Sequence, residues 1–514
     1  MTNILLTGIP KSGKTWLVDK TTELLRDYHE QNVENISLGE LVADKAHELW
    51  NTPKESVADI DPENQQTLRE YAISEAGRRV LRRTAQHVII DTPLTMYVHE
   101  GNVPNAIFNH GHIQGLAKDM GGLDYIVTVT DDAEEIGKRL DGTRYPRDLN
   151  TVMDWISNDI GVAEAIAPIE VNGKRAKHLV IPREFSEQTL AKLLIDPNPT
   201  ISYIGFPITH LTPKSGDSKE KLRFKSDNLR KVMQFIPNYL EYVVGIVPMI
   251  IPDQRVGATK EREHTVFRDK HLFDKYCDLM TGFSPCDVLS LGLLEELRKN
   301  KRTGKPSFLI HPNLSASKIE TFPFIPTLGF SNENEFFQAI ISSRDSNNDG
   351  TVMGTLRRFL DLDQAGTVPR YASLQTFAPA VIIRDEKGRY LLLEQAKGKP
   401  FAGYLTPITG KREIVNGRLE TARENLEREA WQEAGLKING LSKDYYLHRT
   451  DYGSPRYVRF FEARGFEGKV RADNMVDHPE AKKFVRLSLR QILSGKYKIM
   501  PATLQYFKDV RGKD

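Results

Sequence analysis

The sequence is poor in cysteine and contains no long apolar run, and these two shortages exclude several classes of protein. Cys277 and Cys286 are the only cysteines, too few for a disulfide-stapled scaffold or for a cysteine-rich zinc site. No stretch approaches the ~18 apolar residues that a transmembrane helix needs, and the N-terminus lacks the basic region and cleavage site of a signal peptide. We therefore expect a cytoplasmic protein that is neither exported nor inserted in a membrane.

An excess of one charge sign is also missing. The chain has 71 Lys and Arg against 69 Asp and Glu, a net charge of +2. This balance gives no electrostatic reason to expect nucleic-acid or membrane binding, so partners must be inferred from individual sites. The content of 39% hydrophobic and 27% charged residues is typical of a soluble globular protein. A length of 514 residues predicts about three domains; the sequence leaves the oligomeric state open.

Three segments begin alike, and each predicts the first strand of a domain. Apolar, β-branched or aromatic runs lead into glycine- or proline-containing loops near residues 3, 201 and 377. Turn-forming residues gather in LLIDPNPT (193–200), and again in SSRDSNNDGT and DLDQAGTVPR between residues 342 and 370, which predicts domain boundaries. The predicted domains are residues 1–195, 201–345 and 372–514.

The order of helical and strand-like patterns predicts an α/β multidomain protein. In the first segment a strand at 3–8, a helix at 15–28 and strands at 87–91 and 125–130 predict a parallel sheet covered by helices. The second repeats this alternation as a Rossmann-like domain, with a helix at 221–240, a strand at 243–250, a helix at 273–278 and a strand at 307–312. The third is α+β, with strands at 380–385 and 390–395 joined by the turn EKG and a long helix at 420–434.

The segment GIPKSGKT fits the phosphate-binding P-loop pattern GxxxxGK[ST], directly after a strand and at the start of a helix. Gly8 and Gly13 let backbone N–H groups turn toward phosphates, and Lys14 can neutralise their charge. The Thr15 hydroxyl can ligate Mg²⁺, and Asp91, at the end of the strand VIID, is the expected acid that holds the metal through water. The alternative is a chance motif at a helix cap; the strand, loop, helix and later acidic strand end together argue against it.

Beyond the P-loop, residues 2–190 resemble the archaeal-type adenylate kinases. The resemblance rests on the order of GIPKSGKT, ISLGELV, DPENQQTLREYA, VIIDTPLTMYVHEGNVP and IGKRLDGTRYPRDL. It implies ATP as phosphate donor on the P-loop and a nucleoside monophosphate acceptor near Ser37, Thr92 and the Gly101–Pro104 turn. It also implies catalytic arginines in a lid, at Arg139, Arg144 and Arg147. The spacing of these arginines departs from the family by about a residue on each side of Thr143, which leaves the choice of acceptor open.

The middle segment resembles the nucleoside 2-deoxyribosyltransferase and nucleotide N-glycosidase-like family. The pattern that carries the resemblance consists of Asp269, Asp278, Gly292, Glu296 and Gly304-Lys305-Pro306, with Leu293 in place of the family's threonine. A carboxylate beside an anomeric carbon can act as nucleophile or stabilise an oxocarbenium-like state, which would be the role of Glu296. Asp269 and Asp278 would contact substrate. Alternatively, Glu295 and Glu296 form a solvated helix face in a domain that only binds; Cys286 and His311 we interpret as structural.

The segment REAWQEAGL, residues 428–436, resembles the end of the Nudix box, R-E-U-x-E-E-x-G-U, and implies a Nudix α/β/α sandwich. Glu429 and Glu433 share a helix face and could hold Mg²⁺ against a pyrophosphate, with Glu433 also catalytic. Arg428 could fix the carboxylates, and the Gly410 loop would close the site. Two features depart from the box: Gln432 replaces a glutamate, and about four extra residues follow the GKRE that opens at Gly410. A charged surface helix is the alternative.

All three segments indicate small-molecule nucleotides as partners. We predict a multifunctional enzyme that uses ATP and Mg²⁺: a nucleoside monophosphate kinase, an N-glycosidic-bond transferase or hydrolase, and a Nudix pyrophosphohydrolase. The alternative, from a different class, is a nucleotide-sensing regulator that binds ATP and nucleotides without turnover.

Overall fold

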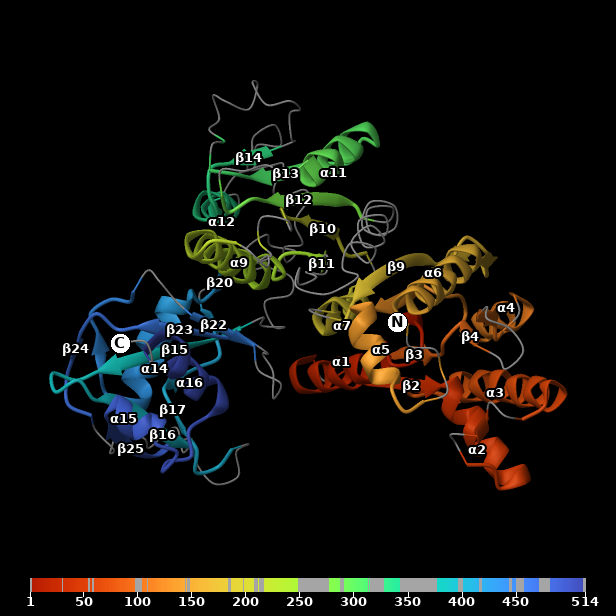
Figure 1. The fold of residues 1–514 in the computed structure, drawn as a ribbon, viewed down its shortest axis with the longest axis horizontal. Helices are drawn as coiled ribbons and strands as arrows, with labels where there is room; N and C mark the ends of the chain where they lie inside the picture. The colour runs from red at the N-terminus through yellow and green to blue at the C-terminus, as the bar shows by residue number, and fades with distance from the viewer. Residues whose placement is uncertain are drawn as a thin grey trace. The chain divides into compact units, whose positions relative to one another are not determined.

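Figure 1 shows the fold in a computed structural model. The chain divides into two compact units. Unit 1 contains residues 1–232 and 243–360, and unit 2 contains residues 233–242 and 361–514. The division into three domains is not tested by these units and stays a prediction. The structure describes residues 2–29, 31–53, 56–57, 60–97, 104–108, 110–143, 145, 148–183, 186–196, 198–207, 211, 217–247, 277–286, 291–312, 314, 328–342, 377–395, 401–415, 418–442, 446–449, 457–470 and 481–511.

Unit 1 begins with a five-stranded parallel sheet of order β2-β3-β1-β6-β9. Its strands are β1 (Asn3–Thr7), β2 (Val33–Ser37), β3 (His87–Asp91), β6 (Tyr125–Thr130) and β9 (Lys177–Pro182). Every residue of β1, β3 and β6 is buried, as expected for strands that helices cover on both faces. This confirms the predicted parallel sheet.

Four of the helices that accompany this sheet begin at side chains that accept hydrogen bonds from free helix N–H groups. Ser37, Asp61, Asp132 and Asp148 serve as these caps. The helices are α1 (Lys14–His29), α2 (Leu38–Trp50), α3 (Pro62–Arg82), α4 (His110–Asp119), α5 (Ala133–Leu140), α6 (Leu149–Ile166) and α7 (Ser186–Ile195), with the short strands β4 (Thr95–Tyr97), β5 (Pro104–Ala106), β7 (Glu170–Val171) and β8 (Lys174–Arg175) between them. The predicted linker 193–200 is wrong at its start, because α7 continues to Ile195 and buries Leu193 and Leu194.

A second parallel sheet in unit 1 has the order β11-β10-β12-β13-β14. Its strands are β10 (Ile201–Gly205), β11 (Val244–Ile246), β12 (Leu279–Phe283), β13 (Ser307–Ile310) and β14 (Leu328–Phe330). Its described helices are α9 (Lys219–Tyr239), which belongs to unit 1 only as far as residue 232, α11 (Leu291–Arg302) and α12 (Glu333–Ser342). These elements confirm the predicted α/β alternation in this segment.

The central strand β12 was missed, and part of the predicted helix at 273–278 is wrong. Residues 273–276 lie outside the described residues, whereas Cys277 and Asp278 are not helical and lead directly into β12. All five residues of β12 are buried between β10 and β13. A short apolar run of this kind has no polar alternation, so its pattern does not distinguish a buried strand from a helix segment.

Unit 2 contains a mixed sheet of order β17-β16-β15-β23-β22, with β18 paired to β15 and β25 paired to β16. The predicted hairpin is confirmed, since β15 (Phe377–Arg384) and β16 (Tyr390–Gln395) are antiparallel. The other elements are β17 (Leu405–Thr406), β18 (Ile408–Thr409), β19 (Ile414–Val415), β20 (Arg418–Leu419), β21 (Lys437–Ile438), β22 (Tyr446–Arg449), β23 (Tyr457–Glu462), β24 (Phe466–Glu467), β25 (Ala481–Leu487), α14 (Ala422–Ala434), α15 (Leu489–Leu493) and α16 (Pro501–Tyr506), followed by a π-helical turn (Phe507–Arg511).

The two faces of this sheet carry separate hydrophobic cores. Along β15, Ala380 and Ile382 belong to a core shared with α15 and α16, whereas Val381 and Ile383 belong to a core shared with α14. This alternation follows from the two-residue period of a strand. Helices therefore cover both faces, as in the predicted α/β/α sandwich. The predicted boundary region between 342 and 370 lies, apart from Ser342, outside the described residues.

Within the described part of the chain, every helix is too short or too polar to cross a lipid bilayer.

Candidate functional site

The predicted P-loop adopts a conformation that only its glycines allow. It links β1 to α1, with φ values of +137° at Gly8 and +101° at Gly13. A Cβ atom on Gly8 would collide with the carbonyl oxygen of Val129 on β6. The Lys14 ammonium group folds over the loop and donates hydrogen bonds to the carbonyls of Gly8 (2.7 Å) and Ile9 (3.3 Å). The loop, its lysine and the N-terminus of α1 are thus held together, in an arrangement that suits an anion.

Asp91 ends β3 beside the P-loop strand, where it pairs in register with Leu6 of β1. It is buried, and its Oδ1 accepts no hydrogen bond from any group that the structure describes. Burial raises the pKa of Asp91, and the nearby charge of Lys14 offsets only part of this rise. A buried carboxylate oxygen that accepts no hydrogen bond can accept one from a metal-bound water molecule, so Asp91 fits a Mg²⁺ site. Thr15 lies in the first turn of α1, where the motif requires its hydroxyl.

Arg139 is the described member of the predicted arginine set. Its Nη1 donates to the carbonyl of Lys11 in the P-loop (2.7 Å), and its Nη2 contacts Asp131 Oδ2 (2.5 Å). Sequence reasoning missed Asp131, at the end of β6, and Arg183, whose Nη1 lies 3.4 Å from the same carboxylate oxygen. Arg183 also covers the ring of Trp16 at 4.7 Å. Arg144 and Arg147 lie outside the described residues.

The described acceptor residues lie at the same edge of the sheet. Ser37 pairs in register with Asp91 and caps α2 by accepting from Glu40 N–H (3.3 Å). Thr92 follows Asp91 directly and is buried. Because the carboxyl ends of parallel strands meet at one edge, both residues lie near the P-loop. Gly101 lies outside the described residues.

Asp159 of α6 is a further polar residue that sequence reasoning missed. It is fully buried and accepts hydrogen bonds from the Thr7 hydroxyl (2.8 Å) and from the N–H groups of Leu94 and Thr95 (both 3.0 Å). Burial raises the pKa of Asp159, against the effect of these hydrogen bonds. The carboxylate ties the end of β1 to the loop after β3; the sequence signal was an acid on the apolar face of α6, where Trp155, Ile156 and Ile160 are also buried.

The middle sheet separates two of the residues predicted to act together. Glu296 on α11 accepts a hydrogen bond from Tyr203 Oη (3.3 Å) and lies against Gly205, which ends β10. Asp278 instead exchanges backbone and side-chain hydrogen bonds with Ile201, which begins β10. A strand rises ~3.3 Å per residue, so the two ends of β10 are ~13 Å apart.

Asp278 thus fixes the start of β10, at the edge of the sheet opposite Gly205 and Glu296, and its contact with substrate stays a prediction. Glu295 is exposed whereas Glu296 is half-buried, so only Glu295 matches the solvated helix face. Asp269 lies outside the described residues.

In unit 2 the sequence of α14 fixes which side chains face the core. The helix begins at Thr421, which forms a reciprocal capping box with Glu424, and ends at Gly435 with φ +65°. Leu426, Ala430 and Ala434 pack into the core beneath it. The predicted helix start at 420 is wrong, since Glu420 precedes the cap. Glu429 and Glu433 lie one turn apart beside the apolar face.

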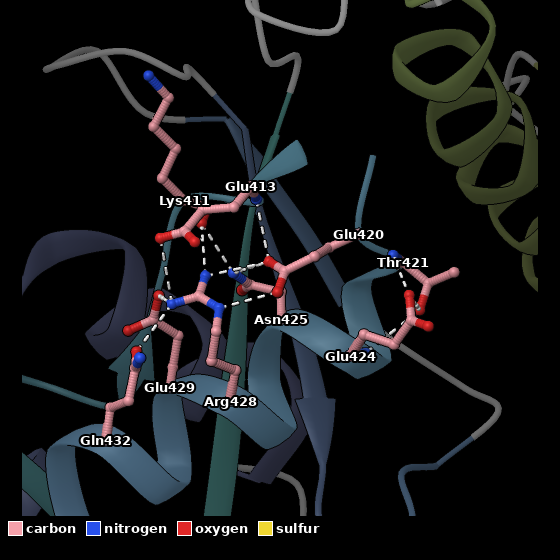
Figure 2. Close-up of polar contacts among 9 residues, drawn as sticks. All are labelled: Lys411, Glu413, Glu420, Thr421, Glu424, Asn425, Arg428, Glu429 and Gln432. Atoms are coloured by element: carbon pink, nitrogen blue, oxygen red, sulfur yellow. Dashed lines mark hydrogen bonds and ion pairs between the residues drawn. The ribbon is translucent and has the colours of Figure 1, made fainter. Parts of the chain in front are cut away.

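Arg428 is the centre of the polar cluster on α14, and Figure 2 shows its guanidinium group among three acidic side chains. Its Nε and Nη2 form a bidentate pair with Glu420 (2.8 and 3.0 Å). Its Nη1 lies 2.8 Å from Glu429 Oε1, 3.4 Å from Glu413 Oε1, and donates to Gln432 Oε1 (2.9 Å). The prediction that Arg428 fixes carboxylates agrees with these contacts.

Glu420 is the principal residue of this site that sequence reasoning missed. Its side chain is only 6% exposed. Desolvation favours the neutral acid, but the hydrogen bonds from Arg428, the Glu413 N–H and Asn425 outweigh this effect and lower the pKa of Glu420. The same hydrogen bond from Arg428 raises the pKa of the guanidinium group. Its signal in the sequence was an acid eight residues before Arg428, which the extra residues after Gly410 obscured.

Gly410 leaves room for Glu429. A Cβ atom at this position would overlap the carboxyl group of Glu429, so the glycine and the carboxylate fit each other. Among the described residues, no three His, Cys, Asp or Glu side chains converge as a closed metal site. Magnesium usually takes one or two protein carboxylates and completes its shell with water and substrate phosphates. Glu429 and Glu433 fit that open arrangement.

Residues 375–507 match the NUDIX domain family, so the C-terminal part of the chain contains a Nudix domain. The match lies within unit 2 and supports hydrolase activity there. A comparison with curated proteins finds no match.

Three solved structures are each similar to about a quarter of the chain. The solution structure of the E. coli ORF135 protein is 24% identical and covers 27% of this chain and 91% of that one, with a TM-score of 0.21. A MutT NUDIX hydrolase from Burkholderia pseudomallei is 19% identical (26% and 97% covered, TM-score 0.22). The MutT protein from Methanosarcina mazei Go1 is 21% identical (27% and 96% covered, TM-score 0.22).

Proposed function

We propose that the Nudix domain uses Mg²⁺ to hydrolyse the diphosphate linkage of small nucleotides. The observation that carries this proposal is the cluster on α14, in which Arg428 holds Glu420 and Glu429. Glu433 follows Glu429 one turn later on the same helix. The pattern of the box and the matched family support the same assignment.

The residues of α14 have separate roles in this proposal. Glu429 and Glu433 would hold Mg²⁺, which when bound neutralises phosphate charge and lowers the pKa of a water molecule. Arg428 and the buried Glu420 fix the position of Glu429 by their shared hydrogen bonds. Gly410 admits the Glu429 carboxylate close to the preceding loop.

The test is Glu433→Gln, which preserves the size of the side chain and removes its charge. We expect Mg²⁺-dependent hydrolysis of a nucleotide panel, including ADP-ribose, NAD and dNTPs, to fall about 100-fold, the lower range for loss of one preorganised electrostatic group. Glu427→Gln is the matched control, because Glu427 on the same helix pairs with the exposed Arg423. Equal hydrolysis by wild type and Glu433→Gln would contradict the proposal.

For the N-terminal part of unit 1 we propose an ATP-dependent nucleoside monophosphate kinase. The P-loop conformation, the Lys14 contacts and the unsatisfied Asp91 oxygen support it. Lys14 and Arg139 would neutralise the transferring phosphoryl group, with Thr15 and Asp91 holding Mg²⁺. Ser37 and Thr92 would contact the monophosphate acceptor.

Lys14→Ala tests the kinase against the nucleotide-sensing alternative. We expect ADP formation with a nucleoside monophosphate to fall about 1000-fold, whereas Lys20→Ala, which removes a half-buried ion pair with Glu23 on the same helix, retains it. Wild type that binds ATP but forms no ADP with any nucleoside monophosphate would favour the regulator.

For the middle part of unit 1 we propose cleavage or exchange of an N-glycosidic bond. The support is the half-buried Glu296 at the carboxyl end of β10, with the Tyr203 hydroxyl as its partner. Glu296→Gln should abolish release of free base from nucleotides, and Glu295→Gln, on the exposed side of α11, is the control. Base release that survives in Glu296→Gln would contradict this proposal.

The proposed activities are linked by one product: the Nudix domain would release a nucleoside monophosphate, which the kinase would consume.

A further inference from the structure

The extra residues of the Nudix box form a small hairpin beside the glutamate cluster. Strands β19 and β20 pair Ile414 with Leu419 and Val415 with Arg418. At the base of the hairpin, the Glu420 N–H donates to the Glu413 carbonyl (2.9 Å), and the Glu413 N–H donates to Glu420 Oε2 (3.0 Å). Two residue pairs are too few for a hairpin to be stable alone, so an external contact must hold its base.

We infer that Asn425 of α14 is a positioning residue that anchors this hairpin and so fixes the carboxylates of the proposed hydrolytic site. The inference rests on the proposed Nudix activity. Asn425 Nδ2 donates to the carbonyl of Lys411 (2.8 Å) and to Glu420 Oε2 (3.3 Å). These two residues flank the hairpin on either side, and Figure 2 shows the amide between them.

Arg428 contacts the same two groups from the next turn of α14. Its Nη2 donates to the Lys411 carbonyl (3.1 Å) and to Glu420 Oε2 (3.0 Å). Each end of the hairpin is therefore held twice by one helix. Arg428 also forms an ion pair with Glu429, whereas both described contacts of the Asn425 amide nitrogen are with the hairpin base.

The buried position of Asn425 indicates that its hydrogen bonds to the hairpin base contribute to the structure. Its side chain is completely buried next to Leu426, which belongs to the hydrophobic core. A polar amide in such a place is unfavourable unless hydrogen bonds compensate it. Asn425 lies one turn before Glu429, and Gly410, one residue before the anchored Lys411, touches Glu429. Movement of the hairpin base would therefore displace Glu429.

Asn425→Asp and Asn425→Ala in the full chain test the inference. Aspartate keeps the shape of the side chain but, when ionised, cannot donate a hydrogen bond. Alanine loses both the shape and the donor. For each variant we expect kcat for nucleotide hydrolysis to fall about tenfold, as for other residues that orient metal ligands, with KM changed less than about twofold. The Mg²⁺ concentration for half-maximal activity should rise. Arg423→Ala, which removes an exposed pair on the same helix, should match wild type.

A pH profile separates positioning from a general effect on folding. The carboxyl group introduced by Asn425→Asp can donate one hydrogen bond when it is protonated, so the activity of this variant relative to wild type should recover as pH falls. Asn425→Ala should not recover. Amide hydrogen exchange at Glu413 and Glu420 should accelerate in both variants. Unchanged exchange at these amides, or activity that falls only in proportion to the unfolded fraction, would overturn the inference while leaving the hydrolase intact. If wild type hydrolyses no nucleotide, the proposed function fails, and exchange still decides whether Asn425 anchors the hairpin.

Discussion

At the N-terminal site, cationic side chains surround a glycine-rich loop, whereas at the C-terminal site three glutamates gather around one arginine. Lys14 and Arg139 both donate to carbonyls of the P-loop. On α14, by contrast, Arg428 contacts Glu413, Glu420 and Glu429. Phosphate can bind the first arrangement directly, but the second repels it unless a cation intervenes. The two sites therefore differ in local charge, as the two phosphate chemistries that we propose for them require.

Gly410→Ala should have the largest effect on the C-terminal side of this comparison. The new methyl group overlaps the Glu429 carboxyl group, and this flexible side chain must move away. We expect hydrolysis to fall about 100-fold, with little change in melting temperature. Gly465→Ala is the control, since its Cβ would meet only Asn439 at 3.8 Å. A melting temperature that drops as steeply as the activity would contradict displacement of Glu429 alone.

Glu420→Gln should show that the buried acid stabilises unit 2 through its charge. Loss of the charged pair with Arg428 should cost about 1.5–3 kcal/mol at neutral pH. The folded-state pKa of Glu420 is lowered, so its contribution is present above the ordinary glutamate pKa and is lost as pH falls through the lowered value. Stability of wild type and Glu420→Gln, measured by denaturant unfolding, should therefore converge in acid. If the free energies of unfolding of the two proteins differ by the same amount at every pH, the charge of Glu420 is not the source of the stabilisation.

Asp131→Ala tests whether the cations of the N-terminal site need a fixed anion. Asp131 contacts both Arg139 and Arg183. Without it, Arg139 should lose its place against Lys11, and we expect the kcat of phosphotransfer to fall about tenfold. The neighbouring Asp132→Ala is a matched control, because it removes the cap of α5 and should lower stability by about 1 kcal/mol with little effect on kcat. Equal kinetic effects would mean that Asp131 acts only through folding.

Gln432→Glu should have the smallest effect on activity. It tests the comparison between the two sites by adding negative charge to the C-terminal one. A carboxylate at this position, which now accepts from Arg428 Nη1, adds negative charge to the site. Higher ligand charge strengthens cation binding, so the Mg²⁺ concentration for half-maximal hydrolysis should fall about threefold in a metal titration. A higher Mg²⁺ concentration for half-maximal hydrolysis would indicate that the added carboxylate binds Arg428. In that case neither Glu420 nor Glu429 would become available to the cation.

The sequence predicted the elements whose local pattern is unambiguous. The P-loop glycines, the three strands β1, β3 and β6 of the first sheet and the i,i+4 glutamates of α14 follow from rules that act within a few residues, whereas β2 and β9 were missed. Glu420 was missed because an inserted hairpin shifted its distance from Gly410. Asp131 and Arg183 meet only after β6 and β9 pair in the sheet, and no local pattern brings them together.

The middle part shows the limit of matching residues by order alone. Asp278 and Glu296 occur at the expected spacing in the sequence, yet β10 separates them. A gap in the sequence does not indicate at which end of a parallel strand a side chain will lie. The strand β12 had to be recognised first, and its short apolar run is compatible with a helix.

The contact between Gly8 and the Val129 carbonyl has a consequence for synthesis of the protein. β1 leaves the ribosome before its neighbours β3 and β6, which begin only at His87 and Tyr125. The P-loop cannot settle against β6 until that strand has emerged. For the proposed kinase, nascent chains that stop before Tyr125 should therefore be unable to retain ATP, and ATP binding would be a late event in the folding of this region during synthesis.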